Sequence, residues 1–312
     1  MSAGSTQFPR HLVPLLVLLT LFWGFNWPMM KLALAEMAPN HFRSLCLLSG
    51  SAGVFIIAAA NRLPIRVPGG AWPRLILISL LNFTAWNVLV AYALPLLSSG
   101  RAAILGYTMP VWGVLFSTWI LKERLTPRRL LGLALGMGGM LLLLWSELSA
   151  VGRSPLGAAL MVLAAMLWGL GTCVMKRWPV GLPASSLTAW QMGIGVIPIL
   201  AYAVFVEPGS FNFLTLSTPA IIGVVYNLVV SFIFCQWAWI KIALVAPVSV
   251  STIATLFVPV VGVFSGALVL GERPHWQDYV ALVLVAAAIA SVLLPARKAV
   301  TVPVRAATPQ AK

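Results

Sequence analysis

The segment WGFNWPMMK at residues 23–31 returns as WGLGTCVMK at residues 168–176. A second pattern, PVWGVLFSTWILKER at 110–124, returns as PVVGVFSGALVLGER at 259–273. The offset between the two copies is nearly the same for both patterns, and the copies follow one another in the same order. We therefore infer that the chain contains an internal repeat.

The composition excludes most classes of protein. Of the 312 residues, 61% are hydrophobic and only 8% are charged, against about 45–50% and about 25% in an average soluble protein. So few charges cannot cover a water-soluble domain, which excludes a soluble enzyme, a nucleic-acid-binding protein, a secreted disulfide scaffold and a disordered chain. The apolar residues form long blocks rather than the alternating strands of a transmembrane β-barrel. We therefore expect an all-α polytopic membrane protein.

Ten blocks are long enough for a membrane-crossing helix, which needs about 20 apolar residues. The predicted spans are 12–35, 41–60, 74–94, 98–121, 128–146, 154–177, 184–206, 217–240, 246–270 and 275–295. The repeat divides these ten transmembrane helices into two five-helix halves, at 12–146 and 154–295. Because five is an odd number, the second half is inverted in the membrane. Inverted repeats are typical of carriers, which hold their substrate near the membrane midplane between the repeats.

The net charge of +14 is explained by topology and requires no nucleic acid. If the N-terminus is cytoplasmic, most Lys and Arg residues fall in cytoplasmic loops, as the positive-inside rule requires. We therefore expect both termini in the cytoplasm. Lys31 and Lys176 then lie near opposite membrane faces, where their long side chains can reach lipid headgroups. Glu123 and Glu272 each precede an arginine at the end of a span, which predicts local ion pairing or helix termination.

The cysteines and histidines form no pattern that indicates chemistry. Cys46, Cys173 and Cys235 lie in different spans without a C-x-x-C pair, and the three histidines are far apart in the sequence. Buried, inert thiols are the expected state of such cysteines. We expect no metal, no cofactor and no enzymatic activity.

The repeated patterns at 23–31 and 110–124, with their counterparts, carry a resemblance to the drug/metabolite transporter superfamily. The chain resembles a ten-helix member with two EamA repeats, and it is most similar overall to the YddG-type exporters of aromatic amino acids. The resemblance implies an alternating-access exporter in the bacterial inner membrane, and we expect a monomer in the lipid bilayer. It also implies that spans one, three, four, six, eight and nine surround the substrate cavity.

Two asparagines are equivalent in the repeat, Asn82 in the third span and Asn227 in the eighth. In a regular helix Asn82 shares a face with Trp86, and Asn227 shares a face with Ser231. Polar groups inside a membrane usually face a cavity or the protein interior. These side chains are therefore predicted either to bind the substrate or to join neighbouring helices by hydrogen bonds.

The arrangement that the resemblance implies gives four candidates for an aromatic cavity lining: Trp27, Trp86, Tyr107 and Trp168. Thr172 lies one turn beyond Trp168 and is a further candidate. Aromatic faces can stack on an apolar side chain or attract an ammonium group. The alternative is that each ring packs in the core or contacts lipid.

The ninth span carries hydroxyl groups ahead of a proline. Ser251 and Thr255 share a face before Pro259, and Pro110 is the equivalent proline of the fourth span. The hydroxyl groups can satisfy carbonyls that a proline leaves unpaired, bind the substrate, or do both. Pro110 and Pro259 are our candidate hinges, and ordinary helix kinks are the alternative.

The positions of the charges also limit the substrate. No Asp or Glu lies at mid-span, so we expect transport without obligatory proton coupling, which usually needs a titratable group in the membrane. Arg and Lys are also absent at mid-depth, so a phosphorylated substrate would lack a cationic partner. A neutral or zwitterionic solute fits better, with its carboxylate bound by backbone N–H groups at a broken helix.

The sequence therefore predicts an exporter of amino acids, aromatic and other neutral ones. A multidrug or other small-metabolite exporter of the same superfamily is the alternative within carriers. An intramembrane enzyme would need a catalytic cluster, which the scattered histidines and terminal acids argue against. A receptor that does not transport would not require an inverted repeat.

Overall fold

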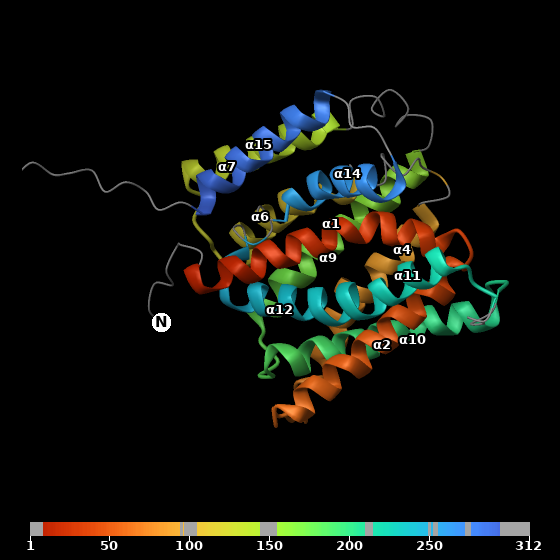
Figure 1. Cartoon of the computed structure of the whole chain (residues 1–312). Helices are drawn as coiled ribbons and strands as arrows, with labels where there is room; N and C mark the ends of the chain where they lie inside the picture. The colour runs from red at the N-terminus through yellow and green to blue at the C-terminus, as the bar shows by residue number, and fades with distance from the viewer. Residues whose placement is uncertain are drawn as a thin grey trace, which may run out of the picture.

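The computed structural model describes residues 9–93, 96, 105–143, 155–209, 215–248, 251, 255–271 and 276–293. Every regular element in these residues is a helix, as the composition predicts. In Figure 1, α7 and α15 lie together at one edge of the molecule, α2 and α10 lie at the opposite edge, and α1 and α9 run between them. Most of the two predicted tails, and Glu272, fall outside the described residues.

The helix boundaries follow the Pro-rich connections, since a proline is well tolerated in the first turn of a helix. The first half contains η1 (Arg10–Leu12), α1 (Val13–Leu34), α2 (Pro39–Ala60), α3 (Trp72–Ser79), η2 (Leu80–Ala85), α4 (Trp86–Ala93), α6 (Met109–Ile120) and α7 (Pro127–Leu143). The second half contains α9 (Pro155–Arg177), α10 (Ala184–Phe205), α11 (Thr218–Tyr226), η5 (Asn227–Cys235), α12 (Gln236–Val245), α14 (Phe257–Leu270) and α15 (Trp276–Leu293).

Six helical stretches are long and apolar enough to cross a membrane. They are Val13–Leu34, Pro39–Ala60, Trp72–Val90, Pro155–Arg177, Ala184–Phe205 and Thr218–Val245. Each coincides with one of the ten predicted spans. The other four predicted spans overlap α6, α7, α14 and α15, which are 12 to 18 residues long. That these four helices also cross the membrane stays a prediction.

Two of the long stretches contain a π-helical segment, η2 between α3 and α4, and η5 between α11 and α12. Asn82 lies in η2 and its repeat equivalent Asn227 begins η5, so both halves carry this widened turn at the same place. Short π-helical segments inside α-helices occur frequently at functional sites. A functional site is therefore expected beside η2 and η5.

Helices that are equivalent in the sequence repeat make equivalent contacts. α1 packs on α14 as α9 packs on α6. A Cβ atom on Gly24 of α1 would lie 2.3 Å from the Cβ atom of Val261 in α14. At the equivalent Gly169 of α9, an added Cβ atom would lie 3.2 Å from the Cβ atom of Trp112 in α6. Glycine is needed at these two positions because the helices approach too closely for a side chain.

The outside of the molecule is strongly apolar. Phe205 is 83% exposed, Leu268 78% and Trp119 70%. In water such surfaces would form an unusually large exposed apolar patch, whereas against lipid tails they are favourable. The interior is also closely packed, with Phe42, Phe83 and Trp239 almost completely buried.

Candidate functional site

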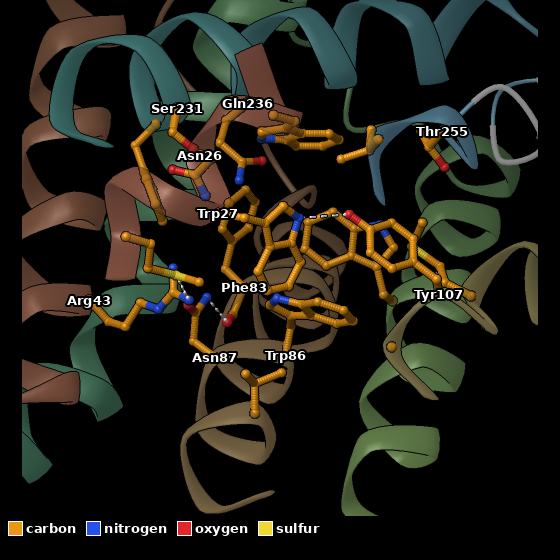
Figure 2. A pocket seen from close by; sticks show the side chains of 18 of the residues that line it. Asn26, Trp27, Arg43, Phe83, Trp86, Asn87, Tyr107, Ser231, Gln236 and Thr255 are labelled. Atoms are coloured by element: carbon orange, nitrogen blue, oxygen red, sulfur yellow. Dashed lines mark hydrogen bonds between the residues drawn. The ribbon is translucent and has the colours of Figure 1, made fainter. Parts of the chain in front are cut away.

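One pocket lies between the two halves, beside both π-helical segments (Figure 2). The empty space between its side chains is about 1080 Å³, counted together with its open mouth. The lining residues are Trp23, Asn26, Trp27, Met30, Arg43, Phe83, Trp86, Asn87, Val90, Gly106, Tyr107, Met109, Met161, Trp168, Ser231, Phe232, Gln236, Thr255 and Val258.

Four large aromatic side chains dominate one side of this pocket. The indole Nε1 of Trp27 donates a hydrogen bond to the hydroxyl oxygen of Tyr107 over 3.3 Å. The rings of Trp86 and Trp168 meet edge to face, with 5.4 Å between their centroids. These contacts hold the rings of α1, α4 and α9 in fixed orientations. They form a surface suited to a flat or branched apolar group.

Side-chain amides dominate the other side. The Oδ1 atom of Asn26 and the Oε1 atom of Gln236 are buried and have no hydrogen-bond partner among the residues that the structure describes. Asn87 donates from Nδ2 to the carbonyl oxygen of Phe83 over 2.8 Å. A buried acceptor that lacks a partner costs free energy, so the oxygens of Asn26 and Gln236 are available to a donor on a bound molecule.

Arg43 also lines the pocket, which the sequence did not predict. It lies in the second turn of α2, and Figure 2 shows it beside Asn87. Its Nη2 atom donates to the sulfur of Met30 over 3.0 Å. Among the described residues, no carboxylate lies within ion-pair distance of Arg43. The sequence shows no Arg or Lys at mid-depth of a span, but Arg43, near the start of α2, supplies a cation to this pocket.

Six of the predicted substrate-binding residues come together in the pocket. They are Trp27, Trp86, Tyr107, Trp168, Ser231 and Thr255. That they bind a substrate stays a prediction, but their shared position is a structural fact. The sequence reasoning missed four polar lining residues: Asn26, Arg43, Asn87 and Gln236. Only Asn26 carried a signal in the sequence, as a polar residue between two tryptophans inside a span.

The other four predicted residues lie outside this lining, and all are almost fully buried. Asn82 donates from Nδ2 to Oε1 of Gln191 in α10 over 3.2 Å, which is the helix-joining alternative. Thr172 and Asn227 bond back along their own helices, to the carbonyls of Trp168 and Gly223. The hydroxyl of Ser251 likewise bonds the Val248 carbonyl.

The two candidate hinge prolines lie in first turns rather than in helix interiors. Pro110 is the second residue of α6 and Pro259 the third residue of α14, where proline interrupts few backbone hydrogen bonds. The side chain of Pro259 lies outside the described residues. Turns at 107–108 and 255–256 precede these two helices, at equivalent places in the repeat. A hinge role for the prolines stays a prediction.

Glutamates at the ends of the bundle join segments that are distant in sequence. Glu207, after α10, accepts hydrogen bonds from the backbone and side chains of Asn40 and His41. Burial raises the pKa of Glu207, but these hydrogen bonds outweigh it and leave the pKa below its usual value. The pKa of Glu36 is also lowered, by hydrogen bonds from the hydroxyl and backbone N–H of Ser217.

A second cluster ties the α6–α7 connection to the segment after α12. Glu123 lies 3.5 Å from Arg129, which confirms a local ion pair, and it also accepts from the backbone N–H of Val248 over 2.9 Å. Lys176 donates to the carbonyl of Ala246. At least one of its donors is therefore bound inside the protein, and its contact with lipid headgroups stays a prediction.

Several known proteins resemble this chain. "Uncharacterized transporter YoaV" of Bacillus subtilis is 27% identical over 83% of this chain and 88% of its own length. "Probable amino-acid metabolite efflux pump" of Escherichia coli is 24% identical over 87% of this chain and 91% of its own, and its namesake in Salmonella typhimurium is equally similar. A crystal structure with 17% sequence identity superposes with a TM-score of 0.79 over 90% of this chain and 96% of that one, which supports the fold.

The family assignment rests on a broader match. Sequence features of EamA-like transporters match residues 12–145 and 155–294, which together cover most of the chain. The apolar helices fit a protein that resides in a membrane, and the names of the relatives indicate a transporter rather than an enzyme. The chain therefore belongs to the EamA-like transporter family.

Proposed function

We propose that this transporter exports amino acids, aromatic and other neutral ones, from the cytoplasm across the bacterial inner membrane. The observation that carries the proposal is the pocket, in which aromatic rings face two amide oxygens that have no partner among the described residues. Such a pocket offers an apolar surface for a side chain and polar groups for an amino-acid backbone. The names of the relatives in Escherichia coli and Salmonella typhimurium support the same class of substrate.

The proposed mechanism is alternating access between two inverted five-helix repeats, at 12–146 and 154–295. The equivalent contacts of α1 with α14 and of α9 with α6 support it, as do the π-helical segments at equivalent places. Exchange of the two halves' conformations would open the pocket to one side and then to the other. We further propose ten spans, cytoplasmic termini and a monomer.

Transport by purified protein in liposomes tests the substrate class. Liposomes preloaded with unlabelled substrate should take up labelled phenylalanine, tryptophan or leucine by exchange. Tetraphenylphosphonium and a uridine-diphosphate sugar represent the two other substrate classes of the superfamily. Exchange of either of these without exchange of any amino acid would overturn the proposal.

Thiol labelling tests the topology. Cys46, Cys173 and Cys235 are buried, so a cysteine introduced in place of the exposed Arg66, between α2 and α3, provides an accessible thiol. An impermeant maleimide should modify it in inverted vesicles and spare it in intact cells. Labelling in intact cells would contradict the proposed orientation.

A further inference from the structure

Arg43 is the one cation among the described side chains that line the pocket, and no Asp or Glu accompanies it there. A guanidinium carries five N–H donors and no acceptor. One donor is directed at the Met30 thioether, which is a weak acceptor, and the Phe42 ring lies 5.8 Å from the Cζ atom. These partners leave the positive charge without a counter-ion among the residues that the structure describes.

The environment makes this arrangement costly unless an anion arrives. Arg43 is half-buried in an apolar bundle, where an unneutralised charge is much less stable than in water. Arginine binds carboxylates through two parallel N–H···O bonds, which gives both strength and a defined orientation. The pocket wall therefore presents a place for a carboxylate group.

The neighbouring amides fit the second charge of an amino acid. The acceptor atoms of Asn26 and Gln236 have no partner in the described part of the chain, and an ammonium group carries three donors. Figure 2 shows Arg43 and Asn26 on one side of the pocket and Tyr107 on the other, with Trp27 and Trp86 between them. One end of the pocket thus carries the guanidinium and an amide, and aromatic rings extend from there toward Tyr107 and the hydroxyl of Thr255.

We propose that Arg43 binds the α-carboxylate of the transported amino acid. The amide oxygens of Asn26 and Gln236 receive its ammonium group, and the aromatic rings receive its side chain. This inference rests on the proposed export of amino acids and specifies how they are recognised. The carboxylate is then bound by the side chain of Arg43 and not by the backbone N–H groups that the sequence suggested. Amines that lack a carboxylate are therefore excluded from the substrates.

Competition in liposomes tests this inference on the unmodified protein. Exchange of labelled phenylalanine should be inhibited by 3-phenylpropionate, which keeps the carboxylate and the ring. Phenylalanine amide and phenethylamine, which lack the carboxylate, should inhibit at least about tenfold less well, because a hydrogen bond to a charged group is lost. Equal inhibition by phenylalanine and its amide would overturn the inference.

The variant Arg43→Gln provides a second test, with Arg66→Gln as its matched control on the exposed loop after α2. Arg43→Gln should raise the half-saturating concentration of phenylalanine by about tenfold or more and remove the discrimination against the amide. Arg66→Gln should change neither quantity. Loss of packing alone would lower activity but would leave the discrimination intact.

The outcomes separate the two proposals. If the unmodified protein exchanges no amino acid, the proposed function fails and the inference fails with it. If it exchanges phenylalanine but Arg43→Gln still discriminates against the amide as the wild type does, only the inference fails. If Arg43→Gln does not fold, the competition series on the unmodified protein decides.

Discussion

The indole Nε1 of Trp27 lies 3.3 Å from the hydroxyl oxygen of Tyr107, and their ring centroids are 6.2 Å apart. This hydrogen bond joins the middle of α1 to the turn that precedes α6, across the wall of the pocket. It therefore orients two of the aromatic rings against which a substrate side chain would pack.

Replacement of Tyr107 by phenylalanine should remove this hydrogen bond and keep the ring. A neutral hydrogen bond contributes about 1 kcal/mol, which corresponds to roughly a fivefold change in affinity. We expect the half-saturating concentration of tryptophan in liposome exchange to rise by about that factor. Tyr279→Phe on α15, whose ring is exposed and outside the pocket lining, is the control and should have no effect.

Replacement of Trp86 by leucine should change the selectivity of the pocket. Contact between aromatic rings contributes about 0.5–1.5 kcal/mol beyond burial, so affinity for phenylalanine should fall by roughly threefold to tenfold. Affinity for leucine should change much less. Trp119→Leu is the control, since Trp119 is 70% exposed on α6. Equal losses for phenylalanine and leucine would argue against an aromatic binding surface.

Replacement of Gly24 by alanine should destabilise the bundle. The added Cβ atom would lie 2.3 Å from the Cβ atom of Val261, so α1 and α14 must move apart. Overpacking of this kind costs about 1–3 kcal/mol, which a thermal melt in detergent would detect. Gly138→Ala in α7 is the control, because no heavy atom lies within 4 Å of its added Cβ. Equal melting temperatures for the two variants would contradict this account of Gly24.

The π-helical segments explain why some of the predicted substrate-binding residues reach the pocket and others do not. The regular helical spacing put Asn82 on the same face as Trp86, and Asn227 on the same face as Ser231. A π-helical turn holds more residues than an α-helical turn, so η2 and η5 shift these faces. Trp86 and Ser231 reach the pocket, whereas Asn82 contacts Gln191 instead.

Arg43 was missed for a different reason. The ends of a span are located from the length of its apolar block and from the distribution of Lys and Arg between the connecting loops. A cation near the end of a span is normally assigned to the membrane surface. Whether its side chain points outward or into a pocket depends on the rotation of α2 against α10, which the sequence pattern does not define. The helices themselves were easier to predict, because a long apolar block has few alternatives in a membrane.

Glu207 should make stability depend on pH. The pKa of Glu207 is lower in the folded state than in the unfolded state. The ionised carboxylate therefore stabilises the fold at pH values above its unfolded-state pKa. This stabilisation is lost as the pH falls through the folded-state pKa. Glu207→Gln should therefore lower the melting temperature in detergent near neutral pH. At an acidic pH below the folded-state pKa, where Glu207 is protonated, the difference between the variant and the wild type should shrink. A difference that is the same at both pH values would contradict the role of the carboxylate.

A pH gradient should not drive accumulation of the substrate. No Asp or Glu is among the described side chains that line the pocket, and the glutamates that the structure describes lie at helix ends, where Glu36, Glu123 and Glu207 bind backbone N–H groups. Proton coupling usually requires a titratable group inside the membrane. Labelled phenylalanine in liposomes should therefore equilibrate to the same level with and without an imposed gradient. A proton ionophore is the control, and uphill accumulation that the ionophore abolishes would require a proton-binding group elsewhere in the chain.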